Sequence, residues 1–321
     1  MDTAAIIDRT RELLAEHYVF PDVARELDAL LAARLAAGAY GVTTPEELGA
    51  LVTADLQSVN GDRHLRLKFH SDQVPDGDDS AVMQQVARSF ELSLGGVPHL
   101  RRLAGGVVHL ELAPSLFPVE WAAEGITAAF TLASRGDALI IDLRANTGGD
   151  PETVALVCSH LLDEPTHLNT MYDRAGEVSR QFWSQSHVPG RRFGGAKPVY
   201  VLTSGTTFSG AEELAYDLQQ LGRATVVGER TGGGAHPRRG FTVHPHLEAT
   251  IPTARAVNPV SGTNWELVGV APDITVPAAD ALDRAHHEAL AELDRRGGDS
   301  PVLAEVRAAL RAGRSVVEPV R

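Results

Sequence analysis

The sequence predicts an α/β protein with two domains. A helical domain, residues 1–72, ends in a strand, and an α/β core, residues 80–321, carries a mainly parallel sheet and C-terminal helices. Two observations lead to this fold class: apolar residues recur at helical spacing through residues 3–60, and from about residue 80 apolar runs alternate with helix-like segments. Such alternation is typical of crossover connections between parallel strands.

The first domain is predicted from its apolar periodicity. Three stripes at helical spacing indicate three helices between residues 3 and 60, and a capping box from Thr44 to Glu47 marks the start of the third. Residues 64–69 then alternate apolar and charged side chains, which predicts a strand. The polar, acidic segment 71–79 is the best candidate for a linker.

The core is predicted from short apolar runs and the amphipathic segments between them. Strands are expected at 107–112, 138–143, 199–203 and 224–228, and helices at 118–134, after Asp150 and after Ser209. Residues 240–277 are expected to be β-rich and residues 279–312 helical. Substrate specificity is expected to lie in loops such as 165–195.

Composition narrows the class of function. Hydrophobic residues make up 43% of the 321 residues and charged residues 22%, which predicts a globular fold. The net charge of −13 argues against nucleic acid or an anionic membrane surface as the main partner. The single cysteine, Cys158, predicts no internal disulfide and is expected to be a small buried residue. The sequence shows no basic-apolar leader and no run of about 18 apolar residues, so a cytoplasmic protein without membrane insertion is expected.

The segment from Val199 to Leu218 gives the clearest indication of chemistry. An apolar strand breaks at Ser204, and an amphipathic helix begins at Ser209. A serine hydroxyl at a helix start lies beside free backbone N–H groups and the positive end of the helix dipole, where it can attack a carbonyl. Serine is also a favoured N-cap, so this segment alone leaves both roles open. Ser204 is a weaker rival nucleophile, because it opens no helix.

Three further segments could take part in chemistry. Gly148 and Gly149 end a strand–turn segment that starts at Asp142, and their N–H groups could bind an anion or oxyanion. This segment is neither a dinucleotide fingerprint nor a P-loop, and it could equally be a tight turn supported by an ion pair. His64 precedes a predicted strand and Glu266 precedes a turn; each alone is ordinary.

In combination, these segments resemble the S41 serine peptidases, the tail-specific or C-terminal processing proteases that include the tricorn core and the interphotoreceptor retinoid-binding protein modules. The front of the chain, with His17–Pro21 and Asp62–Leu65, resembles the branch that includes the retinoid-binding modules. Four blocks in the family's order carry the resemblance: Asp142-Leu-Arg-Ala-Asn-Thr-Gly-Gly149, Thr203-Ser-Gly-Thr-Thr-Phe-Ser-Gly-Ala-Glu-Glu213, Val227-Gly-Glu-Arg-Thr-Gly-Gly-Gly234 and Glu266-Leu-Val-Gly-Val-Ala-Pro-Asp273.

The resemblance implies a crotonase/ClpP-like core and a peptide or protein substrate. It implies that Ser209 is the nucleophile, that His64 is the general base and that Glu266 completes the group. The N–H of Gly210, with one from Gly148 or Gly149, matches the oxyanion hole. Histidine's ordinary pKa of roughly 6.5 suits proton transfer near neutrality, and a carboxylate can orient it.

The sequence also departs from the family pattern. Gly234 stands where tail-specific proteases carry a catalytic lysine, so a Ser–Lys dyad is disfavoured. Arg63 stands where the tricorn type has a serine. No PDZ domain is expected, because core-like elements fill the chain between the linker and Asp142. His236 is a rival base that follows the glycine run.

Two function classes remain open at this stage. The first is a serine peptidase with a Ser–His–Glu mechanism, and the second is a non-catalytic protein that binds small apolar ligands on the same scaffold. No cofactor and no metal are expected: the pair His244 and His246 has no companion ligand at a metal-site spacing. These two histidines, with His286 and His287, are expected at the surface.

Overall fold

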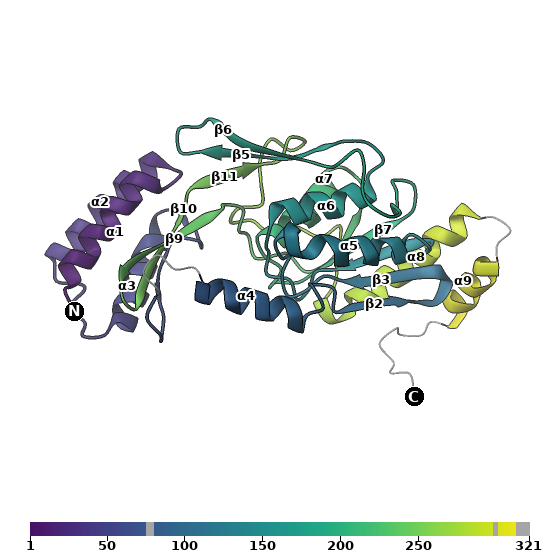
Figure 1. The fold of residues 1–321 in the computed structure, drawn as a ribbon, viewed down its shortest axis with the longest axis horizontal. Coiled ribbons are helices and arrows are strands. Elements are labelled where there is room, and N and C mark those ends of the chain that lie inside the picture. Colours follow the sequence, from purple (N-terminus) through teal and green to yellow (C-terminus); the bar gives the residue numbers. More distant parts are fainter. Residues whose placement is uncertain (75–79, 298–300, 313–321) are drawn as a thin grey trace. The chain divides into compact units, whose positions relative to one another are not determined.

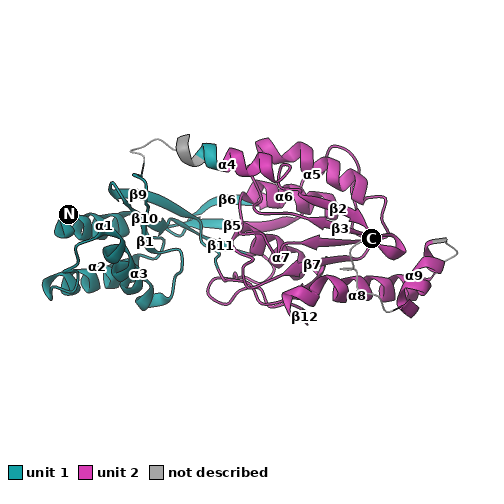
Figure 2. Cartoon of the chain, turned by 90° about the horizontal axis from the view of Figure 1, so that it is seen from below, with its two compact units in different colours: residues 1–85, 170–181, 234–257 teal, residues 86–169, 182–233, 258–321 magenta. Residues whose placement is uncertain are grey.

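The computed structural model describes residues 1–74, 80–297 and 301–312 (Figure 1). They divide into two compact units, coloured separately in Figure 2. Unit 1 comprises Met1–Gln85, Thr170–Gln181 and Gly234–Val257; unit 2 comprises Val86–Asn169, Phe182–Gly233 and Asn258–Arg321. Two later segments therefore belong to the same unit as the helical front. The boundary at residues 72–80 stays a prediction of domain organisation.

Unit 1 begins with three helices, as predicted: α1 (Thr3–His17), α2 (Pro21–Ala36) and α3 (Pro45–Asn60). The capping box of α3 is confirmed, because the Thr44 side chain accepts the N–H of Glu47 and the Glu47 carboxylate accepts the N–H of Thr44. Gly61 ends α3 at φ 75°, a left-handed conformation that favours glycine.

A three-stranded antiparallel sheet completes the core of unit 1. Its strands, in spatial order, are β1 (Arg66–Phe69), β10 (Leu247–Pro252) and β9 (Arg238–His244). Leu67 pairs with Ala249, and both are buried with the apolar faces of the three helices. Burial of these stripes is the main driving force for folding of the unit. The strand predicted at 64–69 is confirmed for its last four residues.

Unit 2 is built on a mostly parallel sheet, as predicted. Neighbouring strands are parallel except for the antiparallel β2–β3 pair. The strands in spatial order are β12 (Ile274–Thr275), β8 (Thr225–Gly228), β7 (Val199–Thr203), β4 (Ala138–Asp142), β3 (Val107–Glu111) and β2 (His99–Arg102). The two central strands, β4 and β7, are buried along their whole length, which is expected for strands of a parallel sheet covered on both faces.

Helices pack on this sheet. α8 contacts β4 and β7, and its Leu282 and Ala285 lie in one core with Ile140 and Leu202. Alternate residues of β4, such as Leu139, are buried as well, so the opposite face is also covered. The helices of this unit and its junction are α4 (Ser80–Leu92), α5 (Val119–Ala133), α6 (Pro151–Leu161), α7 (Gly210–Gln220), α8 (Ala281–Arg296) and α9 (Pro301–Ala312), with short 3₁₀ turns at Ala104–Gly106 and Ala278–Asp280.

Three expectations need correction or fall outside the described residues. Segment 165–195 is not only loop: it contains β5 (His167–Asp173) and β6 (Val178–Trp183), and β5 pairs with β11 (Ala254–Val257). β6 escapes detection because five of its six side chains are exposed. His286 is buried rather than at the surface, since α8 packs it against the carbonyl of Ala104. Most of the expected linker, residues 75–79, lies outside the described residues.

Within the described ranges, none of the helices combines the length and the apolarity needed to cross a bilayer. The absence of a PDZ domain and the location in the cytoplasm stay predictions.

Candidate active site

Ser209 occupies an unusual backbone conformation at the start of α7. Strand β7 ends at Thr203, a short loop follows, and α7 begins at Gly210 (Figure 1). Ser209 has φ 51° and ψ −123°, a region that non-glycine residues rarely adopt and that costs about 1–3 kcal/mol. A serine that only caps a helix normally holds a β-region backbone. The strain at Ser209 therefore points to a function beyond capping.

The glycine turn after β4 lies against this serine within unit 2. A Cβ atom at Gly148 would lie 2.7 Å from the Cβ of Ser209. A Cβ at Gly210 would lie 2.8 Å from the carbonyl oxygen of Gly149 and 3.0 Å from its nitrogen. Real Cβ atoms do not tolerate such distances, so glycine is required wherever these backbones meet. The structure thus brings together four of the expected site residues.

Hydrogen bonds fix the amides of these two turns. The N–H of Gly148 donates to Oδ1 of Asn146 (2.9 Å), and the N–H of Ser209 donates to Oε2 of Glu212 (2.8 Å). Leu116 clamps the glycine turn, because its N–H donates to the Gly148 carbonyl and its carbonyl accepts the N–H of Asp150, both at 2.7 Å. Two amides of the expected oxyanion hole, those of Gly149 and Gly210, remain the candidates for a substrate oxygen.

Asp142 forms an ion pair with Arg144 at the start of the glycine turn, in agreement with the alternative that an ion pair supports this turn. Its two oxygens accept hydrogen bonds from Nε (2.9 Å) and Nη2 (2.7 Å) of Arg144, and Nε2 of His109 lies 3.0 Å away. Burial on its own raises the pKa of Asp142, but the hydrogen bonds with His109 and Arg144 outweigh it and hold that pKa below its usual range. The Asp142 carboxylate is therefore a fixed negative anchor for the turn.

Glu266 lies in the same unit as Ser209, on the loop before β12. The preceding Trp265 is buried, and the N–H of Glu266 donates to the side chain of Asn264 (2.9 Å). The next residue, Leu267, has φ 64° and donates its N–H to the carbonyl of Gly233 (3.1 Å). The backbone on both sides of Glu266 is thus held in place.

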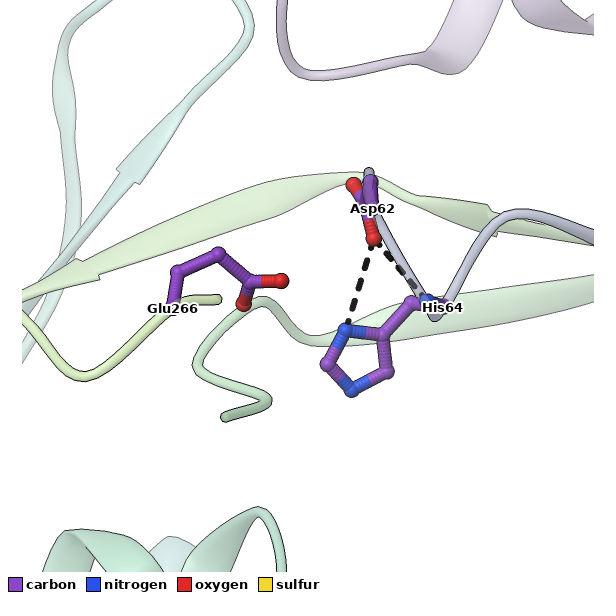
Figure 3. Close-up of side chains that lie close together, drawn as sticks. All are labelled: Asp62, His64 and Glu266. Carbon is purple, nitrogen blue, oxygen red and sulfur yellow. Dashed lines mark hydrogen bonds and ion pairs between the residues drawn. The ribbon is translucent and has the colours of Figure 1, made fainter. Parts of the chain in front are cut away.

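His64 lies in unit 1, in the turn between α3 and β1, and is buried. Its N–H donates to Oδ1 of Asp62 (2.9 Å), and its carbonyl accepts the hydroxyl of Thr250 (2.7 Å). Nδ1 of His64 lies 3.7 Å from the same oxygen of Asp62. Figure 3 shows the His64 ring beside the Asp62 carboxylate. The approach of His64 to Ser209 and Glu266 stays a prediction.

His236, the rival base, faces the same carboxylate from within unit 1. Its Nδ1 lies 3.8 Å from Oδ2 of Asp62, and its ring packs edge-on against Phe20. The Tyr18 hydroxyl donates to that same oxygen (3.0 Å). Burial raises the pKa of Asp62, but the contacts with His236 and His64 outweigh it and hold that pKa well below its usual range. Asp62 is a buried anion with both histidines beside it.

Two residues beside these candidates, Asp62 and Glu212, were not predicted from the sequence to take part. Asp62 stands two residues before His64, a spacing that allows its side chain to accept the histidine's N–H, so a local signal was present. Glu212 was expected only as part of the α7 segment, because its partners Thr231 and Gly233 are too distant in sequence to be found by pattern. Ser204, the rival nucleophile, is buried and donates its hydroxyl to the carbonyl of Arg144 (2.6 Å).

Comparisons with known proteins identify the family. Residues 119–276 match the model of peptidase family S41, and residues 2–92 match that of the N-terminal domain of Peptidase_S41 in eukaryotic IRBP. The carboxy-terminal-processing protease of Bartonella bacilliformis is 27% identical over 137 residues, 43% of this chain; the chain spans only 30% of that relative's length.

Two solved structures share the fold. A crystal structure of a putative peptidase from Parabacteroides merdae has a TM-score of 0.63 at 17% identity and covers 94% of this chain and all of its own. The crystal structure of the tricorn protease has a TM-score of 0.54 at 14% identity over 96% of this chain and 36% of its own. These two likenesses concern the fold. The two family models, both of peptidase family S41, together match most of the sequence in order and show that the chain belongs to this family.

Proposed function

We propose that this protein is a serine peptidase that hydrolyses peptide bonds through an acyl-enzyme formed on Ser209. The observation that carries the proposal is the strained backbone of Ser209 at the first turn of α7, packed against a glycine turn. Strained residues cluster at active sites, where the surrounding structure holds them in place. Membership of family S41 supports the same class of reaction.

The chemistry begins with the Ser209 hydroxyl. Its Oγ forms a bond to the carbonyl carbon of the substrate while His64 takes its proton, and the carbonyl electrons move to the oxygen. The amides of Gly149 and Gly210 donate to that oxyanion. When the C–N bond breaks, His64 gives the proton to the leaving amine. Water then attacks the ester with His64 again as base, which releases the acid and restores Ser209.

Two carboxylates are proposed to position and stabilise the histidine base. Glu266 completes the catalytic group by stabilising the protonated imidazole, as a third triad member does. Asp62 holds the backbone of His64 and lies beside its ring within unit 1. Because His236 lies beside the same carboxylate, the choice of base needs a test. We expect His64→Gln to lose turnover and His236→Gln to retain most of it; the reverse result would assign the base to His236.

The positions of the two lysine side chains argue against a lysine as the general base. The sequence contains two lysines, Lys68 and Lys197. Lys197 precedes β7, at the end of that strand opposite to Ser209, and donates to the carbonyls of Ser134 (2.8 Å) and Gly136 (2.9 Å). Lys68 is exposed on β1. This supports a histidine-dependent mechanism.

The proposed substrates are peptides or proteins. The Bartonella relative is named for processing at the carboxyl terminus, so peptides with a free carboxyl terminus are the first substrates to try. The alternative, a binding protein for apolar ligands, would have no use for the strain at Ser209, and no second function is proposed.

The test compares two serine variants on a library of peptides. Ser209→Ala should reduce hydrolysis by about 10³-fold or more, since removal of a triad nucleophile leaves only the contribution of binding and the oxyanion hole. Ser204→Ala, a change of the same kind in the loop between β7 and α7, is the matched control and should retain activity. Turnover that survives in Ser209→Ala and disappears in Ser204→Ala would contradict the proposal.

A further inference from the structure

Glu212 is a fully buried acidic residue in the first turn of α7, three positions after Ser209. Its Oε2 accepts the N–H of Ser209 (2.8 Å). Its Oε1 accepts the N–H of Gly233 (2.7 Å) and the hydroxyl of Thr231. One carboxylate therefore joins the serine turn to a chain segment about 20 residues further along the sequence.

Hydrogen bonds join that segment to the loop that carries Glu266. The carbonyl of Gly233 accepts the N–H of Leu267 (3.1 Å). Thr231 bonds Val270 twice: its N–H donates to the Val270 carbonyl (3.2 Å), and its hydroxyl oxygen accepts the Val270 N–H (2.7 Å). Residues 231–233 and 267–270 thus pair just after Glu266.

We infer that Glu212 is a positioning residue that holds Ser209 and the Glu266 loop in one fixed arrangement. The inference rests on the proposed function, because it assigns Glu212 a part in the same site. All of the contacts that carry it lie within unit 2. An unbroken series of hydrogen bonds runs from the Ser209 amide through the Glu212 carboxylate and Gly233 to Leu267.

The carboxylate is suited to this place because three donors converge on it. An ionised carboxylate offers acceptor sites only, and hydrogen bonds to it are shorter and stronger than neutral ones. Its position in the first turn of α7 also places the negative charge at the positive end of the helix dipole. A glutamine of the same shape would turn an NH₂ group toward one of the donors, so one of the two segments would lose its anchor.

Glu212 also determines which amides face the substrate. By accepting the N–H of Ser209, it turns that amide inward and fixes the peptide plane that precedes the Gly210 amide. A shift of this plane would move the Gly210 N–H away from the substrate oxygen. Loss of Glu212 should therefore slow bond-making more than it weakens substrate binding.

The experiment compares Glu212→Gln with Glu213→Gln. The two residues are adjacent, both are buried, and both changes are isosteric. Glu213 accepts a hydrogen bond from the amide of Asn169 (3.0 Å), which a glutamine oxygen can also accept. We expect Glu212→Gln to lower kcat by about tenfold or more with KM nearly unchanged, and to slow fluorophosphonate labelling similarly, while Glu213→Gln stays within about twofold of the natural protein.

A readout that needs no catalysis accompanies the kinetics. Amide hydrogen exchange measured by mass spectrometry should become faster in Glu212→Gln both around Ser209 and in residues 264–270, and in neither segment of Glu213→Gln. Faster exchange confined to α7, or equal effects of the two variants, would overturn the inference. If the natural protein neither hydrolyses peptides nor reacts with the probe, the proposed function fails, and the exchange pattern alone then decides whether Glu212 joins the two segments.

Thr231→Val provides a second variant should Glu212→Gln not fold. It keeps the shape of the side chain but removes the hydroxyl that bonds both Glu212 and the Val270 amide. We expect faster exchange in residues 264–270 and a kcat reduced by about threefold or more. Unchanged kcat and unchanged exchange in this variant would overturn the inference as well.

Discussion

One oxygen of Asp62 accepts the backbone N–H of His64 at 2.9 Å and lies 3.7 Å from Nδ1 of the same histidine. The residue expected to act as base is therefore held by a carboxylate within its own unit. If His64 is the base, Asp62 should influence its activity.

Asp62→Asn should lower kcat by about tenfold or more, because the amide keeps the size of the side chain but no longer stabilises a protonated histidine. Asp55→Asn is the matched control, since Asp55 accepts hydrogen bonds from Tyr40 (2.7 Å) and Arg34 (3.0 Å) in the same unit. Equal activity losses in the two variants would show that Asp62 has only a structural role.

The effect of Asp62→Asn on the free energy of unfolding should depend on pH. The folded-state pKa of Asp62 lies below its ordinary value of 3.8, so its stabilising contribution is present above about pH 4 and is lost as the pH falls through the folded-state pKa. The difference in free energy of unfolding between the natural protein and Asp62→Asn should shrink as the pH falls below about 4. Denaturant unfolding followed by circular dichroism at several pH values measures it. A difference that grows toward low pH would contradict the assignment.

The strained backbone at Ser209 predicts which of two variants at this position is more stable. Glycine adopts φ 51° and ψ −123° freely, whereas alanine keeps the steric penalty. Ser209→Gly should therefore be more stable than Ser209→Ala by about 1 kcal/mol, although glycine loses more chain entropy than alanine on folding. Thermal unfolding compares the two variants. Greater stability of the alanine variant would mean that the serine turn is relaxed.

The glycine turn predicts a sharp contrast between two Gly→Ala changes. A Cβ at Gly149 would lie 1.9 Å from the carbonyl oxygen of Leu116, so Gly149→Ala must displace the turn and should cost about 2 kcal/mol or more as well as activity. At Gly125, on α5, a Cβ would meet no atom within 4 Å. Gly125→Ala should be neutral or stabilise by up to about 1 kcal/mol. Similar melting temperatures for both variants would contradict the close packing of the turn.

Because the pKa of Glu213 is raised, we expect the protein to lose stability as the pH rises. Burial raises the pKa of Glu213 to about 7, although the hydrogen bond from Asn169 lowers it. Since the ordinary value is 4.5, the native state keeps a proton that the unfolded state releases, and stability is lost as the pH rises from about 4.5 through about 7. Glu213→Gln should melt several degrees above the natural protein at about pH 8 and level with it near pH 4. Glu124→Gln, an exposed change on α5, should show no such dependence.

Much of the fold follows from local patterns. The capping box at Thr44, the buried run 199–203 and the apolar stripe of α7 each satisfy a rule that acts over a few residues, and the structure confirms the corresponding elements. β6 obeys no such rule, because its side chains are mostly exposed. The partner of β1 is a strand about 180 residues later, and no local pattern can specify that pairing.

In the candidate site, too, some residues could be predicted from local patterns and others depend on distant contacts. Gly148 and Gly149 follow strand β4, and Ser209 and Gly210 follow strand β7. Their meeting therefore follows from strand order once β4 and β7 are recognised as neighbours in the sheet. Glu212 acts through partners on a different segment, which depends on how the chain after β8 folds back toward α7. The meeting of His64 with Ser209 and Glu266 stays a prediction, to be tested by function.

The position of a covalent adduct tests whether Ser209 is the reacting nucleophile. The natural protein is treated with a fluorophosphonate and digested, and the modified peptide is located by mass spectrometry. We expect a single adduct on Ser209 that is absent from His64→Gln at short reaction times. An adduct on Ser204 or another residue, or no adduct in a protein that hydrolyses peptides, would contradict it.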